Sequence, residues 1–533
     1  MNLILLLAAV VIFACVLMNR LTNRLGLPVL LAFIGLGMLF GSDGILKIPF
    51  EDFEMAEKIC SVALIFIMFY GGFGTNLREA RPVLGRALLL SSAGVVVTAA
   101  LTGLFCHFVL GFGLLEGLLL GAVLGSTDAA SVFSILRSKK LGLRYHTASL
   151  LEVESGSNDP FAYMLTVILL SVMGGEQMGV LEVLRAVGAQ LVFGAGFGLL
   201  IAWGAIRFLR RFTFPNSGME TVFVLGVALL SFALPTLVGG NGYLSAYVVG
   251  ILLGNAKLKN KNELVHFFDG VTGFAQMALF FLLGLLAFPS QMGINLLPAL
   301  AIALFLTLVA RPVAVCSLLA PFRAKFGQLV VVSWAGLRGA ASIVFAILVR
   351  MSPVAVGSDV FHIAFCVVLF SIAIQGSLLP LCARRTGMID ETESVLKTFS
   401  DYSDEKGVQF IRIELREENP WVGKKIRELT LPPRMLVAVI YRGEGTVIPG
   451  GDTEFLPGDI AVLSAVSKPS LGDARFEEVE VEKKSSLCGR RLREIELPAG
   501  ELVVLIRRGE EMLVPKGDTV ILEGDLLVLN ERN

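Results

Sequence analysis

Polar side chains interrupt an apolar stretch at residues 150–170, which reads LLEVESGSNDPFAYMLTVILL. At helical spacing Glu154 lies over Asn158 and Ser155 lies over Asp159, so the group covers one broad face. Ionisable groups inside a membrane span are costly and are functional candidates by default. Asp159 lies deepest, beside an amide and a hydroxyl that carry no counter-charge, and is the strongest candidate for chemistry.

Further apolar stretches carry polar residues among glycines. GAVLGSTDAASVF holds Thr127 and Asp128 at mid-depth, and WAGLRGAASIV holds Arg338. Another stretch contains Arg311 followed by Pro312. Glycine-interrupted spans at corresponding positions of two halves predict a transporter built from inverted repeats with broken helices.

These residue types suit a dehydrated monovalent cation, which needs oxygen ligands of mixed kinds. Asp159, Asn158, Ser155 and Thr127 supply carboxylate, amide, hydroxyl and carbonyl oxygens. A carboxylate in a low-dielectric cavity is easier to protonate, so a proton and a cation compete for one site. One titrating carboxylate beside a neutral amide predicts one proton exchanged for one cation, which is an electroneutral cycle.

The neighbouring polar residues have structural interpretations as well. Asp128 suits the cap of a broken helix as well as it suits a cation site. Glu154 and Arg338 are expected to form a buried ion pair that joins two spans. Glu152 is expected near the cytoplasmic interface, without a role. Pro160 removes a backbone donor and predicts that the helix opens at this point.

The composition places most of the chain in a bilayer. Of the 533 residues, 55% are hydrophobic and only 17% are charged, and the mean hydropathy is +0.76. A soluble protein of this length is therefore excluded. Apolar runs recur at the length that crosses roughly 30 Å of hydrocarbon. We expect thirteen spans, near residues 2–19, 28–44, 59–74, 87–110, 114–136, 147–173, 183–206, 218–238, 242–256, 264–288, 293–319, 328–349 and 357–382.

Clusters of Lys and Arg occupy every second loop between these spans, for example at residues 137–144, 207–211 and 384–385. The positive-inside rule places the N-terminus outside and the C-terminal tail in the cytoplasm. We therefore expect a multi-pass protein of the plasma (inner) membrane. The seven cysteines lack metal-ligand spacing, so no metal site is expected beyond that of a transported cation.

The charged C-terminal tail contains an internal repeat. A membrane domain at 1–388 is followed by a linker at 389–406, a lobe at 407–465, a second linker at 466–478 and a second lobe at 479–533. Residues 422–463 align without gaps on residues 488–529, and twenty of those 42 positions are identical. Short β-rich runs broken by Gly-Asp turns predict two α+β units packed about a pseudo-twofold axis.

Three motifs resemble the monovalent cation:proton antiporter family, within it the NhaP-type, CvrA-like branch. They are STDAASVFSIL at 126–136, the run from Glu152 to Asp159, and GLRGAASI at 336–343. Many relatives have a proline after the Thr-Asp pair, where this chain has Ala129. That variant resembles the potassium/proton group, which favours K⁺ over Na⁺.

The resemblance implies a fold and roles for the motif residues. It implies a polytopic α-helical membrane protein with an NhaA-like fold of about 13 spans, in a homodimer. Asp159 would bind the ion and the proton, with Asn158 as its neutral partner and Ser155 and the Thr127 backbone as ligands. Asp128 is also a candidate cation ligand. Glu154 would pair with Arg338.

Each tail lobe resembles the RCK-C (TrkA-C-like) lobe of potassium transport regulators. The Rossmann lobe that normally precedes it is missing, and no GxGxxG follows a strand, so no NAD or ATP cofactor is expected. Two alternatives stay open for the lobes. They bind a small nucleotide, such as a cyclic dinucleotide, or they only pack and dimerise.

We therefore expect a secondary antiporter, not an enzyme, that exchanges K⁺ or Na⁺ for H⁺ by alternating access. The lobes would regulate it, and its role would lie in pH, cation and volume homeostasis. No nucleic-acid partner is expected. The alternatives are a Na⁺-selective antiporter, a ligand-gated cation channel and a membrane-embedded hydrolase. A channel would require a filter of carbonyls or charged rings, and the sequence has no such motif.

Overall fold

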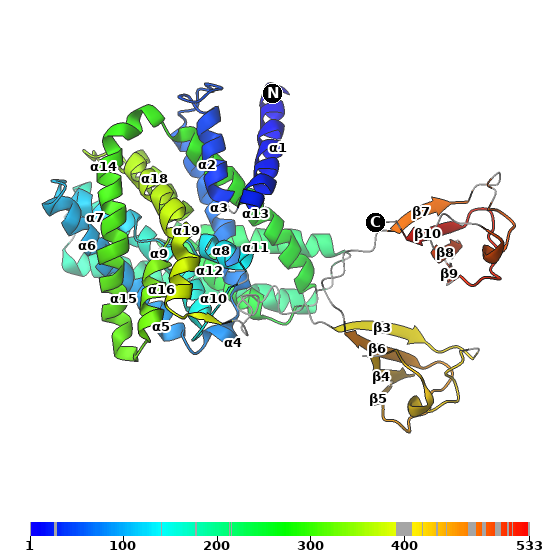
Figure 1. Cartoon of the computed structure of the whole chain (residues 1–533). Coiled ribbons are helices and arrows are strands. Elements are labelled where there is room, and N and C mark those ends of the chain that lie inside the picture. The colour runs from blue at the N-terminus through cyan, green and yellow to red at the C-terminus, as the bar shows by residue number, and fades with distance from the viewer. Residues whose placement is uncertain are drawn as a thin grey trace. The chain divides into compact units, whose positions relative to one another are not determined.

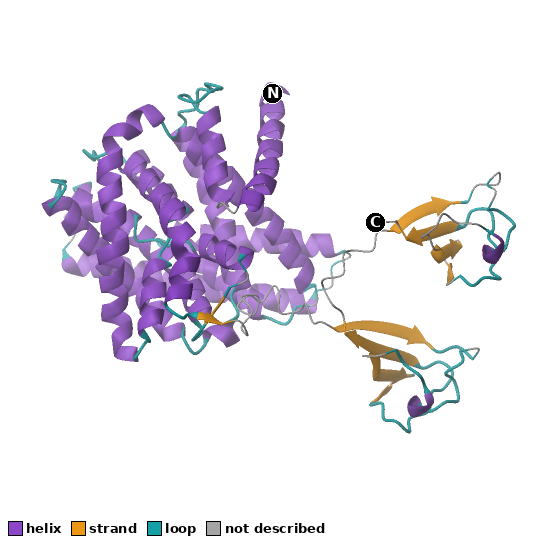
Figure 2. Cartoon of the chain, viewed as in Figure 1, coloured by secondary structure: helices purple, strands orange, loops and turns teal. Residues whose placement is uncertain are grey.

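The structure is a computed structural model of the chain (Figure 1). It describes residues 2–25, 29–139, 141–175, 179–212, 214, 216–258, 260–390, 408–417, 419–432, 435–443, 445–466, 476–481, 485, 487–495, 503–508, 511–513 and 515–530. Two compact units are present, at residues 1–404 and 405–533. The first is helical and the second is built from strands (Figure 2).

The helical unit follows the apolar pattern of the sequence. Seven of its described helices are long and apolar enough to cross a membrane, and five further apolar helices have 10 to 17 residues. The count of thirteen crossings stays a prediction. The helices are α1 (Asn2–Leu25), α2 (Val29–Phe40), α3 (Phe53–Gly74), α4 (Leu77–Ala80), α5 (Leu84–Leu89), α6 (Val95–Phe108), α7 (Leu114–Val123), α8 (Ala129–Ser138), α9 (Thr147–Met173), α10 (Val180–Arg211), α11 (Ser217–Leu237), α12 (Gly242–Asn255), α13 (Lys261–Leu286), α14 (Pro289–Phe305), α15 (Arg311–Leu319), α16 (Phe326–Trp334), α17 (Ala340–Met351), α18 (Val360–Phe370) and α19 (Ser377–Arg385).

Two helical segments are broken at the glycine-rich motifs, as predicted. Residues 124–128 separate α7 from α8, and residues 335–339 separate α16 from α17. The two breaks cross each other, because the Asp128 amide donates to the Leu337 carbonyl at 2.8 Å. The crossing depends on Gly339, where an added Cβ would lie 2.4 Å from the Asp128 Cβ.

Three helical segments contain a π turn rather than a break. The turns are η1 (Leu90–Gly94) between α5 and α6, η2 (Leu306–Ala310) between α14 and α15, and η4 (Ser371–Gly376) between α18 and α19. π turns inside α-helices are frequently found at functional sites. The first two lie in the spans predicted to be fourth and eleventh, which correspond in two inverted halves. Each of these spans directly precedes a broken segment.

The prediction that Pro160 opens its helix is wrong. α9 runs without interruption from Thr147 to Met173. The helix packs against α5, α7, α12 and α17, so surrounding elements hold it closed. The Pro160 carbonyl also accepts a hydrogen bond from Asn241 Nδ2 at 2.8 Å. Tertiary packing thus overrides the local preference of the proline.

Glycines let α12 pack closely on α3. A Cβ added at Gly250 would lie 2.0 Å from the Phe69 carbonyl, and one at Gly254 would lie 1.9 Å from the Phe73 carbonyl. Small residues allow such approach between membrane helices, which have no hydrophobic driving force between them in lipid. The α3–α12 pair is therefore a tightly packed wall beside α9.

A short antiparallel ladder ties the end of the helical unit to the start of α9. β1 (Gly142–Leu143) pairs with β2 (Ile389–Asp390), with Gly142 opposite Asp390 and Leu143 opposite Ile389. The Arg144 amide extends the ladder by donating to the Met388 carbonyl at 2.9 Å. Met388 itself is buried in the core of the helical unit.

The tail contains two four-stranded antiparallel sheets of the same design. The first has the order β3 (Val408–Glu414), β6 (Ile460–Val466), β4 (Met435–Arg442), β5 (Gly445–Val447). The second has the order β7 (Phe476–Glu480), β10 (Leu526–Asn530), β8 (Val503–Arg508), β9 (Glu511–Leu513). The described tail residues add only one-turn 3₁₀ helices at 426–428 and 492–494, so the expected α+β character is reduced to β-sheet there.

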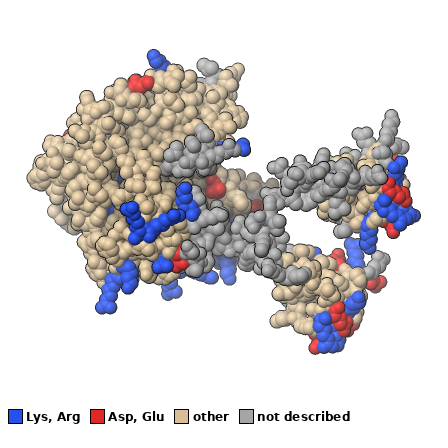
Figure 3. Space-filling view, in the orientation of Figure 1, with Lys and Arg blue, Asp and Glu red and all other residues tan. Residues whose placement is uncertain are grey.

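The repeat preserves, in each sheet, an ion pair between a partly exposed arginine and a buried aspartate. Arg442 Nη2 lies 2.7 Å from Asp459 Oδ2, and Arg508 Nη2 lies 2.7 Å from Asp525 Oδ2, 66 residues further on. Each guanidinium holds the pKa of its aspartate below the usual range. Other charged side chains gather on the surfaces of the two sheets, whereas the visible face of the helical unit is mostly uncharged (Figure 3).

Candidate functional site

The crossing of the two broken helices places four predicted side chains together. Ser155 Oγ, on α9, donates to the Thr127 carbonyl at 2.5 Å. Asn158 Nδ2 donates to Thr127 Oγ1 at 2.5 Å, and the Thr127 amide donates to Asn158 Oδ1 at 3.3 Å. Asp159 follows on the same helix and is buried. The unwound backbone at 124–128 and one face of α9 thus form a single polar surface.

Ser126 is part of this surface and was missed in the sequence. Its hydroxyl donates a short hydrogen bond to Asp159 Oδ1. Hydrogen bonds to a carboxylate are about twice as strong as neutral ones. The available signal was the position of Ser126 immediately before Thr127, in a stretch expected to unwind. In such a stretch a neighbouring hydroxyl reaches the same partners.

Asp128 has a structural role in this arrangement. Its carboxylate accepts from the Ser131 amide at 3.3 Å and from the Ser131 hydroxyl. These are the contacts of a helix cap at the start of α8. Of the two roles left open by the sequence, the geometry supports capping, and a role as a cation ligand stays a prediction.

The predicted pairing of Glu154 with Arg338 is wrong. Arg311 Nη2 lies 2.6 Å from Glu154 Oε1, and both side chains are buried. The contact is electrostatic, since neither atom meets hydrogen-bond geometry with a described residue. Arg311 begins α15 directly after the π turn η2. The signal in the sequence was Arg311 itself, a second arginine inside an apolar run.

Arg338 instead joins the two breaks. Its Nη1 donates to the Ser126 carbonyl at 2.9 Å, and its backbone amide donates to Ser371 Oγ at 2.9 Å. The Ser126 carbonyl lies just beyond the end of α7, where helix carbonyls carry partial negative charge. The guanidinium therefore stabilises the interrupted end of one helix from the middle of another.

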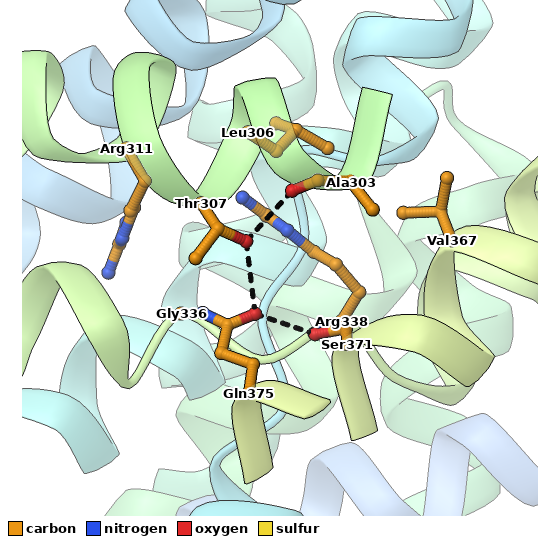
Figure 4. Close-up of a pocket in the computed structure, with 9 residues that line it drawn as sticks. All are labelled: Ala303, Leu306, Thr307, Arg311, Gly336, Arg338, Val367, Ser371 and Gln375. Atoms are coloured by element: carbon orange, nitrogen blue, oxygen red, sulfur yellow. Dashed lines mark hydrogen bonds between the residues drawn. The ribbon is translucent and has the colours of Figure 1, made fainter. Parts of the chain in front are cut away.

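A small polar pocket lies between Arg311 and Arg338, lined also by Thr307, Gly336 and Gln375 (Figure 4). Gln375 Oε1 accepts from Ser371 Oγ at 2.9 Å and from Thr307 Oγ1 at 3.4 Å. Its Nε2 donates to the Trp334 carbonyl at 2.6 Å. The π turn η4 thus supplies the side chains that hold the second break in place.

Glu152 is buried in α9, with 6% of its surface exposed. Its position near the cytoplasmic interface of the membrane stays a prediction.

The oxygen atoms at the first break suit a small hard cation. Asp159 contributes a carboxylate, Ser155 a hydroxyl, Asn158 an amide oxygen, and residues 126 and 127 their carbonyl and hydroxyl oxygens. Such a mixture can replace a hydration shell. Both arginines are engaged elsewhere, Arg311 with Glu154 and Arg338 with the Ser126 carbonyl. Neither arginine forms an ion pair with Asp159, so its carboxylate can gain or lose a proton without breaking one.

Comparison with known proteins shows the family to which the chain belongs. A family profile described as sodium/hydrogen exchanger, transmembrane, matches residues 7–385, and a TrkA-C domain profile matches residues 410–468 and 476–529. The chain is 32% identical to a K(+)/H(+) antiporter NhaP2 of Shewanella baltica, over 87% of this chain and 81% of the relative. It is 35% identical to a K(+)/H(+) antiporter NhaP of Alkalimonas amylolytica, over 83% and 78%.

A more distant relative and a solved structure extend the match. The Na(+)/H(+) antiporter ApNhaP of Aphanothece halophytica is 25% identical, over 70% of this chain and 71% of the relative. The fold is similar to that of the sodium proton antiporter MjNhaP1 of Methanocaldococcus jannaschii, with a TM-score of 0.61 and 23% identity over 71% of this chain and 100% of that one. The chain therefore belongs to the transmembrane sodium/hydrogen exchanger family, and its tail carries TrkA-C sequence in both sheets.

Proposed function

We propose that this protein is a secondary antiporter that exchanges a monovalent cation for H⁺, with K⁺ preferred to Na⁺. One observation carries the proposal: a buried aspartate, Asp159, accepts from Ser126 and lies among the neutral oxygens of Ser155, Asn158 and Thr127. The relatives named as K⁺/H⁺ antiporters have higher identity than the one named as a Na⁺/H⁺ antiporter, which favours K⁺.

In the proposed cycle Asp159 holds either a proton or a cation. Binding of the cation requires loss of the proton, because both need the same carboxylate. Asn158 stays neutral throughout, so one proton replaces one cation and no net charge moves. The crossing of the breaks would carry this site between the two sides of the membrane, which is alternating access.

We further propose the orientation that the positive-inside rule predicts. The N-terminus would lie outside, the tail in the cytoplasm and the protein in the plasma membrane as a homodimer. The tail would regulate exchange, with a small nucleotide as the ligand to test first. Its cellular role would be homeostasis of pH, cations and volume.

The test is proton flux in reconstituted vesicles with K⁺, Na⁺ or Li⁺ added in turn. Asp159→Asn should reduce the flux by at least about 100-fold, the effect of removing an essential ionisable group. Glu54→Gln is the control, because Glu54 is exposed and forms only a surface pair with Lys58. Full exchange by Asp159→Asn would overturn the proposal.

Two further measurements test the proposed stoichiometry and the proposed regulation by the tail. An electroneutral cycle should give the same flux when a membrane potential is imposed, and a potential-dependent flux would exclude that stoichiometry. For the tail, the chain should be cut after Asp390 rather than after Arg385, because the shorter version loses the β1–β2 ladder. Unchanged activity and pH response of the longer version would exclude regulation by the tail.

A further inference from the structure

A second buried carboxylate lies on α9, and the proposed cycle does not use it. Glu152 precedes Asp159 by seven residues, which is about two helical turns, or roughly 10 Å along the axis. Residues at this spacing lie on nearly the same face of a helix. Glu152 is on the side of Thr147, the end of α9 that the charge pattern places in the cytoplasm.

Gly156 lies between these two carboxylates and leaves a gap on that face. Tyr247 of α12 fills the gap. A Cβ added at Gly156 would lie 2.4 Å from Tyr247 Cε2 and 2.7 Å from its Oη. The phenol therefore rests against the backbone of α9, one turn from Glu152 and one turn from Asp159.

The Tyr247 hydroxyl is placed to interact with both carboxylates. Glu152 and Asp159 act on it electrostatically. The hydroxyls of Thr75 and Ser157 also lie beside the phenol as hydrogen-bonding groups, and neither titrates near neutral pH. Tyr247 is 3% exposed, so its Oη is shielded from bulk water.

The backbone of Tyr247 packs closely against α3. A Cβ added at Gly72 of α3 would lie 2.3 Å from the Tyr247 carbonyl. The phenol thus belongs to the tightly packed α3–α12 wall, whereas the two carboxylates belong to α9. The Asp128 carboxylate also acts electrostatically on Asp159, and the Glu154 carboxylate of α9 is paired with Arg311.

From this placement we propose that Glu152 and Tyr247 form a proton relay to Asp159 from the cytoplasmic side. A protonated Glu152 donates its proton to Tyr247 Oη, and the phenol's own proton passes to the Asp159 carboxylate. Glu152 is left ionised, Asp159 is neutral and Tyr247 keeps one proton, so one proton has moved and no atom is lost. Rotation of the hydroxyl resets the phenol for the next proton.

The relay rests on the proposed antiport, but it can be tested separately. Proteoliposomes loaded with K⁺ would be assayed for K⁺/H⁺ exchange and for Rb⁺/K⁺ exchange at fixed pH, which moves no proton. Glu152→Gln and Tyr247→Phe should each lower K⁺/H⁺ exchange about 100-fold, the lower end of the contribution of one proton-transfer group. Both should leave Rb⁺/K⁺ exchange within twofold of the parent protein.

The double variant is a second readout. Since both groups serve one path, Glu152→Gln with Tyr247→Phe should be no slower than either single variant. A merely structural role would lower both kinds of exchange together, and such a result would overturn the relay. So would normal K⁺/H⁺ exchange by both single variants. Failure of the antiport itself would appear differently, as full exchange by Asp159→Asn.

Discussion

The two broken helices have similar backbones and opposite charges. The first break, at 124–128, places hydroxyl and carbonyl oxygens around Asp159 of α9. The second break, at 335–339, places Arg338 beside Ser371 and the pocket that Gln375 lines. In the proposed cycle the buried carboxylate at the first break exchanges a proton for a cation. At the second the Arg338 guanidinium donates to the Ser126 carbonyl, and the pocket beside it is lined by hydroxyl and amide groups and by Arg311.

This difference suits two separate roles, ion exchange at the first break and structural stabilisation at the second. A site that binds a proton and a cation in turn needs a charge that can be neutralised. A crossing that must survive every turnover needs a charge that is always present, and arginine supplies it because it does not lose its proton in proteins.

The largest effect is expected at the buried Glu154–Arg311 pair, which joins α9 to α15. Glu154→Gln should destabilise the protein by about 3–5 kcal/mol, because it leaves a buried guanidinium without its counter-charge. Arg311→Gln should cost a similar amount. Thermal unfolding of the detergent-solubilised protein measures both effects. The double variant should recover part of the loss, and if it is no more stable than the single variants the two charges are not coupled.

A side chain added in the second break at Gly339 should displace Asp128 of the first break. Gly339→Ala introduces a Cβ 2.4 Å from the Asp128 Cβ, and we expect a cost of about 1–3 kcal/mol and reduced exchange. Gly71→Ala is the matched control, because no atom lies within 4 Å of a Cβ at that helical position. Equal activity of both variants would show that the breaks do not need to approach this closely.

The paired serines compare the two breaks directly. Ser126→Ala removes a hydrogen bond to a carboxylate, worth about 1.5–3 kcal/mol, and should slow exchange about tenfold or more. Ser371→Ala removes a bond to the Arg338 amide, worth about 1 kcal/mol, and should lower stability while exchange stays near that of the parent. Equal slowing by the two variants would contradict the division of roles.

The smallest effect is expected in the tail, where the two sheets serve as controls for each other. The lowered pKa of Asp459 and Asp525 means that each arginine pair adds stability above the ordinary aspartate pKa of about 3.9. That contribution is lost as the pH falls through the lower, folded value. Hydrogen exchange of tail peptides in the full chain should therefore show protection that is constant from pH 7 to about 5 and weaker below about 4.

Arg442→Met and Arg508→Met should each cost about 1 kcal/mol in their own sheet and remove most of this acid dependence. Because the repeat offset is the same for all four residues, the two variants should behave alike. Loss of protection in only one sheet would show that the other is held by different contacts.

Much of the site could be predicted because membrane spans make polar residues conspicuous. Asp159, Asn158, Ser155 and Thr127 were each found by their cost in an apolar run, and the structure brings them together. The breaks were predicted by their glycines. The sequence pattern does not give the distances between helices. Glu154 was therefore paired with Arg338, whereas the structure pairs it with Arg311.

One other error has the same origin. Pro160 suggested an opening because its local preference is strong, but the helices around α9 hold the segment in helical form. The cover that Tyr247 of α12 gives to the α9 face between Glu152 and Asp159 could not be predicted either. In both cases contacts between elements far apart in the sequence decided the outcome.

The ladder between β1 and β2 has a mechanical consequence. Chain displacement that begins after Asp390 meets backbone hydrogen bonds to Gly142 and Leu143 before it reaches α19. Those two residues connect α8, which Asp128 caps, to α9, which carries Glu152 and Asp159. The last strand of the helical unit, β2, is therefore hydrogen-bonded to the connection between α8 and α9. α9 carries the candidate site residues. A pull of even a few ångströms on this strand would act on that connection first.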